Sequence, residues 1–237
     1  MSAVRIRRVV TTRDGGISVS PYASFNLGAH VGDRPDAVVA NRKRLAAGIG
    51  LAPQRVIWME QVHGCTATVV EGPREQPVPA SDAVVTAQPR LAVAVLVADC
   101  VPVLLADPVR KIVAAVHAGR VGARAGVLPA ALAAMTRLGA RLEDVEVLLG
   151  PSACGQCYEV PDRMQAEVEA RLPGSACRTR KGTSGLDLRA GLWGQLAAAG
   201  VARVGVDPRC TIEDPALYSY RREGVTGRLA AVTWFEQ

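Results

Sequence analysis

The chain has 237 residues, of which 49% are hydrophobic and 21% charged, which is enough for one large domain with a sizeable core. Its formal charge is +6, but the basic residues are spread along the chain without an aromatic-rich RNA motif or a helix-turn-helix signature, so we expect no nucleic-acid partner. The longest apolar stretch, Leu91–Ala98, is too short to cross a bilayer, and the first ten residues lack the apolar segment of a signal peptide. These features predict a cytoplasmic protein that does not associate with membranes.

Strand patterns dominate the first half of the chain. Strands are predicted over residues 4–11, 17–20, 56–63, 67–70, 83–87, 91–98, 103–106 and 111–117. A helix is predicted over residues 36–49, because apolar residues recur at helical spacing and a glycine follows. The strand over 91–98 has no polar alternation, so both of its faces are expected to lie under helices or another sheet.

Helices and strands alternate in the second half. Helices are predicted over residues 123–138 with a kink at Pro129, over 162–171 with Asp162 as a cap, and over 188–199 with Asp187 as the N-cap and Gly200 at the end. Strands are predicted over residues 145–149, 203–206 and 228–235. The chain has no repeat or long linker, so we predict one domain over residues 1–237, a layered α/β sandwich with a mixed sheet.

Three residues with ligand-type side chains stand at the ends of apolar, strand-like runs: His63, Cys100 and His117. The chain has only three histidines, and two of them belong to this group. Two imidazoles and a thiolate suit a transition-metal site with one position open for water or substrate. They also suit a Cys-His nucleophile pair. Both interpretations predict an enzyme.

Hairpin geometry brings two of these residues together. Residues 107–110 have the composition of a tight turn, and a regular hairpin with Asp107 opposite Arg110 places Cys100 directly opposite His117 on one face. Cβ atoms in such a pair are about 4.5–5.5 Å apart. Pro102 suggests a bulge or a break in this strand, and a slip of one residue would separate the two side chains. His63 must arrive through tertiary packing.

The pair Cys154-Gly-Gln-Cys157 has the spacing of a redox motif or of half a zinc site. It follows a predicted strand and a Gly-Pro turn rather than opening a helix, and no second CxxC completes a zinc site. In the expected compartment the six cysteines are predicted to be reduced.

Several blocks, in order along the chain, resemble one known family. The N-terminal blocks are Ser24-Phe25-Asn26-Leu27-Gly28, His30-Val31-Gly32-Asp33, and Asn41-Arg42 with Leu45. The central blocks are Gln61-Val62-His63-Gly64, Ala98-Asp99-Cys100-Val101-Pro102 and His117-Ala118-Gly119. The C-terminal blocks are Gly150-Pro151, Cys157-Tyr158-Glu159-Val160, Leu186-Asp187-Leu188, Ser219-Tyr220-Arg221-Arg222 and Thr226-Gly227-Arg228. The family is that of the laccase-domain purine nucleoside phosphorylases of bacteria, formerly described as multicopper polyphenol oxidases.

The resemblance implies a fold similar to that of Cys-His hydrolases of the deamidating-toxin type. It implies phosphorolysis of adenosine, inosine and 5′-methylthioadenosine to the free base and the corresponding sugar 1-phosphate, and also deamination of adenosine. Purine nucleosides and phosphate are then the partners, and the oligomeric state stays open. The ligands of the family's zinc, or copper, match His63, Cys100 and His117. Zinc with an open position activates water, which deamination requires.

The same resemblance suggests further site residues. Asp99 is a candidate for an acid/base group or for support of the metal, although neighbours on a strand point to opposite faces. Phosphate needs cations or backbone N–H groups, for which Arg42, Arg120 and Arg221 are candidates. Asn26 either binds ribose or base, or holds the turn at Gly28. The family usually continues His-Ala-Gly with Trp-Arg-Gly, whereas this chain has Arg120-Val121-Gly122, so its specificity can differ.

Three alternatives belong to other functional classes. Cys100 and His117 suit a metal-free amide hydrolase, and the resemblance to bacterial relatives implies the editing of peptidoglycan precursors as its role. Copper suits phenol oxidation, but a multicopper cluster needs more than the three histidines present. A non-catalytic nucleic-acid or division-apparatus binding protein would bind phosphate polymers in a salt-dependent manner and would not need Cys100.

Overall fold

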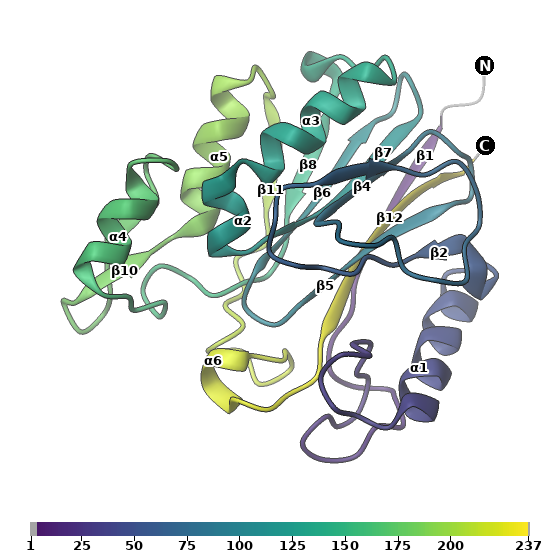
Figure 1. Ribbon diagram of the computed structural model, residues 1–237, viewed down its shortest axis with the longest axis horizontal. Helices are drawn as coiled ribbons and strands as arrows, with labels where there is room; N and C mark the ends of the chain where they lie inside the picture. The colour runs from purple at the N-terminus through teal and green to yellow at the C-terminus, as the bar shows by residue number, and fades with distance from the viewer. Residues whose placement is uncertain (1–3, 237) are drawn as a thin grey trace.

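Residues 4–236 are described by the computed structural model, in which two β-sheets lie between two layers of helices (Figure 1). The helices are α1 (Pro35–Gly48), α2 (Arg120–Ala125), α3 (Val127–Arg137), α4 (Asp162–Glu169), α5 (Leu188–Ala198) and α6 (Tyr220–Glu223). The strands are β1 (Arg5–Val10), β2 (Val56–Ile57), β3 (Ala67–Val69), β4 (Ala83–Thr86), β5 (Ala92–Val97), β6 (Val101–Asp107), β7 (Ile112–Ala118), β8 (Glu146–Leu149), β9 (Ala176–Arg178), β10 (Ser184–Leu186), β11 (Arg203–Val206) and β12 (Leu229–Glu236). Short 3-10 turns cover Pro53–Arg55 and Leu142–Asp144.

The strands form two mixed sheets and a separate hairpin. The first sheet has the order β1-β12-β5-β2 and the second β11-β8-β6-β7-β4-β3, while β9 pairs with β10. The pairs β2–β5, β3–β4 and β8–β11 are parallel, and the others in these sheets are antiparallel. This confirms the predicted layered α/β class with mixed pairing. The first and last strands, β1 and β12, lie side by side in one sheet (Figure 1).

Side-chain alternation explains why the central strands are apolar throughout. In β5, Val93 and Val95 pack in the core between the two sheets, whereas Ala92 and Ala94 pack in the core that includes α1. Strands β6 and β7 alternate in the same way between the inter-sheet core and a third core beneath α3 and α5. Each central strand is therefore covered on both faces, as its uninterrupted apolar sequence predicts.

Strands β6 and β7 form the predicted hairpin in a different register. Asp107 pairs with Ile112, two residues beyond its predicted partner. Pro102, not Cys100, lies opposite His117, and β6 continues through Pro102 without a break. Direct opposition of Cys100 and His117 is therefore a wrong prediction. A shift of two residues keeps both side chains on the same face, because the side-chain period of a strand is two.

Two predictions about strands are wrong in their extent. Residues 17–20 contribute only the bridge between Ser18 and Ser24, because the chain doubles back there and Asn41 binds the loop through its side chain. The strand predicted over 56–63 ends at Ile57, where pairing with β5 ends. The residues that follow lead to a turn at His63, whose φ is 59°.

Helix ends also differ in part from the predictions. The helix predicted over 123–138 is divided at Gly126, with φ of 92°, and Pro129 lies in the first turn of α3, where proline is tolerated. Asp162 is the first residue of α4 rather than its cap, and it accepts a hydrogen bond from Ser184 Oγ at 2.5 Å. Asp187 caps α5 as predicted, by accepting from the Ala190 N–H at 3.1 Å.

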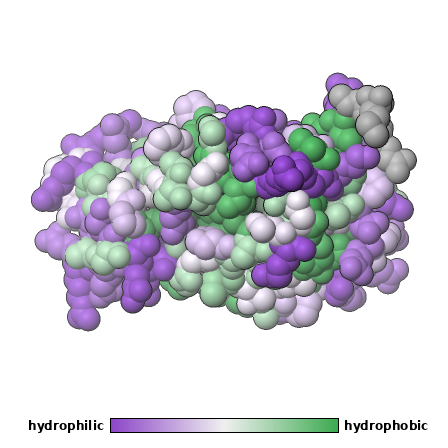
Figure 2. Space-filling model, turned by 90° about the horizontal axis from the view of Figure 1, so that it is seen from above, coloured by the Kyte–Doolittle hydropathy of each residue, from purple (hydrophilic) through white to green (hydrophobic). Residues whose placement is uncertain are grey.

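The face drawn in Figure 2 has hydrophilic side chains at both of its ends, and hydrophobic side chains gather toward its middle. None of the helices in residues 4–236 is both long and apolar enough to cross a membrane.

Candidate active site

His63, Cys100 and His117 converge at one end of the space between the two sheets. One ligand atom from each lies within 4.8 Å of the others. Cys100 Sγ is 3.9 Å from His63 Nε2, and the two imidazole rings meet edge-on with centroids 4.6 Å apart. His63 comes from the turn after β2, Cys100 directly precedes β6, and His117 lies at the end of β7. Tertiary packing thus supplies the third residue that hairpin geometry alone does not place.

Asp82, directly before β4, holds two of these residues in place. Its side chain is fully buried, and Oδ1 lies 2.8 Å from His117 Nδ1. The same carboxylate accepts backbone N–H groups from the turn: His63 at 3.0 Å and Gly64 at 2.7 Å. One buried carboxylate therefore orients the His117 ring and anchors the turn that presents His63.

The charges of these groups reinforce one another. Burial opposes ionisation of the Cys100 thiol, but the charge of His117 and hydrogen bonds from both histidines outweigh it and lower the pKa of Cys100 to about 6. Burial also disfavours the His117 imidazolium, but the Cys100 thiolate and Asp82 raise the pKa of His117 to about 9. Around neutral pH the group favours a thiolate beside an imidazolium.

The same donor set fits a metal ion. His117 uses Nδ1 for Asp82, which leaves Nε2 for a ligand bond, and a carboxylate behind a histidine is a common support of metal-binding imidazoles. Two imidazoles and one thiolate form a three-ligand set with room for a fourth group.

Gly119 allows the close approach of these side chains. A Cβ at this position would lie 2.9 Å from Cys100 Sγ and 3.0 Å from His63 Cδ2. Any side chain here would displace the thiol or the imidazole. The glycine that follows His117-Ala118 is therefore required by space.

The three residues line a cavity of about 420 Å³. This volume lies within the range of small-ligand sites. The other polar and aromatic side chains on its wall are His30, Gln61, Asp99, Tyr158, Tyr220, Arg221 and Arg228. The guanidinium of Arg221 lies 4.9 Å from the centre of the Tyr158 ring, and that of Arg228 lies 5.9 Å from the centre of the Tyr220 ring. The cavity thus offers cations and aromatic faces beside the His63, Cys100 and His117 centre.

Two further candidates from the sequence, Asp99 and Arg221, also line the cavity. Asp99 has φ of 96°, so the local bend brings it to the same wall as Cys100 despite their adjacency. Its Oδ1 accepts from Thr211 Oγ1 at 2.6 Å, and its Oδ2 accepts from the Arg221 N–H at 2.7 Å. These bonds join the segment before β6 to the loop after β11 and to the start of α6.

Among the described residues 4–236, three candidates from the sequence do not line this cavity: Asn26, Arg42 and Arg120. Asn26 is buried, and its Oδ1 accepts the N–H groups of Gly28 at 2.9 Å and Arg228 at 2.8 Å, so it holds a turn and the backbone of a cavity residue. Arg42 donates to Leu27 O and lies over Trp58 beside a neighbouring hollow. Arg120 is the first residue of α2.

Sequence reasoning assigned no role to several residues of the site. His30, Tyr158, Tyr220 and Arg228 belong to the family-like blocks, and this was the available signal for them. Burial and the charge of Arg228 lower the pKa of His30, which favours its neutral form. Asp82 stands outside those blocks. A carboxylate directly before a buried strand was its only signal.

Comparisons with known proteins identify the family of this chain. The family described as multi-copper polyphenol oxidoreductase laccase matches residues 7–236. A purine nucleoside phosphorylase of Corynebacterium glutamicum is 58% identical over 231 residues, which are 97% of this chain and 94% of the relative. One of Mycobacterium tuberculosis is 56% identical over 234 residues, 99% of this chain and 94% of the relative.

Solved structures show the same fold. YlmD from Geobacillus stearothermophilus superposes with a TM-score of 0.92 at 33% identity, over 98% of this chain and 92% of that one. The hypothetical protein YfiH from Bacillus licheniformis gives a TM-score of 0.90 at 29% identity, over 97% and 92% of the two chains. Because the family matches residues 7–236, the chain belongs to the multi-copper polyphenol oxidoreductase laccase family, whose members include proteins named purine nucleoside phosphorylase.

Proposed function

We propose that this chain is a purine nucleoside phosphorylase acting on adenosine, inosine and 5′-methylthioadenosine. The observation that carries the proposal is the convergence of His63, Cys100 and His117 on a cavity that also presents Arg221 and Arg228. The names of the two bacterial relatives support the same activity.

The chain's own residues suit the demands of this reaction. Phosphate oxygen attacks C1′ of the ribose, and the bond from C1′ to N9 breaks with its electron pair leaving on the purine. Arg221 and Arg228, which line the cavity, are the candidates to hold the phosphate, since guanidinium groups bind phosphate oxygens in pairs. The rings of Tyr158 and Tyr220 offer flat faces for the base. Neutral His30 is a candidate to hydrogen-bond the ribose or the base.

A metal ion fits His63, Cys100 and His117, and we propose zinc, with copper as the alternative. Such an ion supplies Lewis-acid polarisation of substrate atoms when bound. Asp82 would hold the His117 ring with Nε2 free for the ion, and Gly119 would keep space beside the thiol. We propose that deamination of adenosine occurs in the same cavity, where Asp99 is the candidate acid/base group.

We also propose that residues 1–237 act as one domain in the cytoplasm. The family match over residues 7–236 and the pairing of β1 with β12 support the first part. The six free cysteines support the second.

Product chromatography of adenosine, with and without phosphate, tests the proposed function. Adenine that forms only with phosphate is the expected result, and inosine reports deamination separately. His117→Ala should abolish both products, whereas Cys177→Ser, outside the cavity, should leave them unchanged. Absence of base and of inosine under both conditions would contradict the proposal.

One observation favours a second candidate, a Cys-His amide hydrolase that edits peptidoglycan precursors. The lowered pKa of Cys100 and the pair of His117 with Asp82 resemble an activated thiol with an oriented base. Activity on an amide substrate that survives complete removal of metal by a chelator would support this candidate over the phosphorylase.

A further inference from the structure

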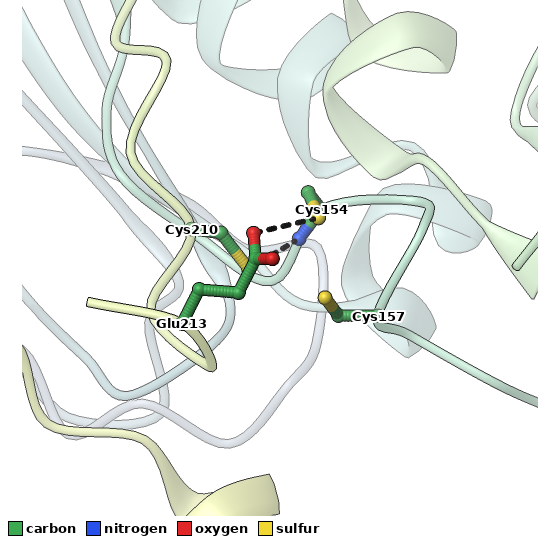
Figure 3. A group of neighbouring side chains, drawn as sticks. All are labelled: Cys154, Cys157, Cys210 and Glu213. Atoms are coloured by element: carbon green, nitrogen blue, oxygen red, sulfur yellow. Dashed lines mark hydrogen bonds between the residues drawn. The ribbon is translucent and has the colours of Figure 1, made fainter. Parts of the chain in front are cut away.

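A second group of ligand-type side chains lies outside the cavity centre: Cys154, Cys157, Cys210 and Glu213. One ligand atom from each lies within 4.8 Å of the others. Figure 3 shows the three thiols and the carboxylate pointing toward one another from two separate loops. The loops follow β8 and β11, which pair in parallel, and a bridge between Ser152 and Cys210 keeps them together.

Each loop carries its two ligand-type side chains on a turn of the same kind. The Cys157 N–H donates to Cys154 O at 3.0 Å, and the Glu213 N–H donates to Cys210 O at 3.1 Å. Each pair is thus separated by two residues within a tight turn. Two such turns facing each other are the arrangement of structural zinc sites built from C-x-x-C pairs. Here Glu213 takes the position of the fourth cysteine.

The distances and hydrogen bonds suit a tetrahedral ion. In a tetrahedral site with zinc–sulfur bonds of about 2.3 Å and a zinc–oxygen bond of about 2.0–2.2 Å, a sulfur and an oxygen ligand lie about 3.5–3.7 Å apart. Cys154 Sγ is 3.8 Å from Glu213 Oε2. Arg180 binds the other oxygen, Oε1, which turns Oε2 toward the thiols. The Cys154 N–H donates to Cys210 Sγ at 3.4 Å, a bond that stabilises a thiolate ligand.

Ordinary packing of cysteines explains this group less well. Cys154 and Cys157 are only half-buried, so they are not simple core side chains. A carboxylate aimed at three thiols has no benefit in packing, whereas a divalent cation would attract the carboxylate and three thiolates to one point, with Arg180 offsetting part of their negative charge. Cys177 lies nearby but donates to Gly155 O at 3.3 Å and is not one of the four donors.

We propose that Cys154, Cys157, Cys210 and Glu213 form a structural zinc site that ties the loop after β8 to the loop after β11. This inference is independent of the proposed function. The ion would support one wall of the cavity: Tyr158 follows Cys157 directly, and Thr211 follows Cys210 and donates to Asp99.

Zinc content of the full chain tests the proposal, once the cavity centre has been removed by Cys100→Ser with His117→Ala. Purified under reducing conditions, this variant should retain about one zinc per chain, as expected for a closed four-ligand site. Cobalt(II) in its place should give the strong sulfur-to-cobalt charge transfer of several thiolates. Adding Cys157→Ser and Cys210→Ser should abolish both signals, whereas adding Cys177→Ser should change neither.

Glu213→Gln is the conservative variant, in case the double cysteine variant fails to fold. It keeps the shape of the side chain, and it should weaken zinc binding at least about tenfold. Circular dichroism checks the fold of each variant. A folded Cys100→Ser/His117→Ala protein without zinc, in which Cys154, Cys157 and Cys210 all react as free thiols, would overturn the proposal. A disulfide between Cys154 and Cys157 in the protein purified from cells would also overturn it.

Discussion

Two groups of ligand-type side chains in this molecule differ in how many donors they contain and in what lies beside them. The group of His63, Cys100 and His117 has three donors and faces a cavity of about 420 Å³. The cysteine cluster consists of Cys154, Cys157, Cys210 and Glu213 and has four ligand-type side chains. Two of them lie in the loop after β8 and two in the loop after β11, the strand that pairs with β8. Catalytic metal sites keep a position open, whereas structural sites are closed by four protein ligands.

The two groups also differ in the charge around their thiols. Imidazoles beside Cys100 favour its thiolate, and a carboxylate behind His117 strengthens this effect. In the cysteine cluster, burial and neighbouring thiols raise the pKa of Cys157 to about 12 when no cation is present. The open group is thus ready to react at neutral pH without an ion, and the closed one needs an ion to ionise its thiols.

The largest expected difference concerns alkylation of metal-free protein. At pH 7.5 iodoacetamide should modify Cys100 about 100-fold faster than Cys157, because its larger thiolate fraction outweighs the lower intrinsic nucleophilicity of a thiolate with a lowered pKa. The Cys100 rate should rise with pH around about 6, since its pKa is lowered and the thiolate is lost below that value. Peptide mass spectrometry measures both rates. Equal alkylation rates would contradict the proposed difference in thiol pKa between the two groups.

Paired serine variants should separate activity from stability. Cys100→Ser should lower kcat/KM for phosphorolysis at least about 100-fold with little change in melting temperature. Cys157→Ser should lower the melting temperature by about 5 °C or more while kcat falls far less. Steady-state kinetics and thermal melts, taken on the same preparations, check both effects. A large loss of activity in Cys157→Ser with a lowered melting temperature in Cys100→Ser would contradict the catalytic role of Cys100 and the structural role of Cys157.

Asp82→Asn tests the carboxylate that supports the cavity centre. The variant keeps the size of the side chain but weakens its hold on His117 Nδ1, so metal affinity should fall about 10–100-fold. Asp107→Asn is the matched control, because Asp107 is also fully buried and also accepts backbone N–H groups, at the far end of β6. Competition with a metal indicator measures the affinity. An equal loss in both variants would show general destabilisation instead.

The smallest expected effect concerns two arginines, one that lines the cavity and one beside the cysteine cluster. Arg228→Lys should raise KM for phosphate about tenfold, because lysine cannot hold two phosphate oxygens at once. Arg180→Lys, beside Glu213, should leave that KM unchanged. Initial rates at varied phosphate concentration decide the matter. A similar rise in both variants would point to long-range charge rather than to contact with phosphate.

The sequence indicated much of the cavity centre, because strand periodicity is a local property. It predicted that Cys100 and His117 share a face, and this holds although the register differs by two residues. The exact pairing was not predictable from the turn residues alone, since Asp107 closes a longer turn with its side chain. Asp82 was missed because its contacts with His117 and the turn at His63 span 35 and 19 residues.

The cysteine cluster marks the limit of sequence reasoning more sharply. The spacing of Cys154 and Cys157 suggested half a zinc site, and the absence of a second CxxC argued against completing it. The partners, Cys210 and Glu213, stand more than 50 residues away and match no C-x-x-C pattern.

The sequence by itself determined the α/β class, the strands buried on both faces, the capped end of α5 and the types of donor available, because these follow from composition and local periodicity. Only the tertiary structure decided which donors meet. The parallel pairing of β8 with β11 brings the cysteine cluster together, and the buried Asp82 carboxylate gathers the turn at His63 and the end of β7. Contacts between distant segments depend on how sheets pair and pack, and local sequence does not encode that arrangement on its own.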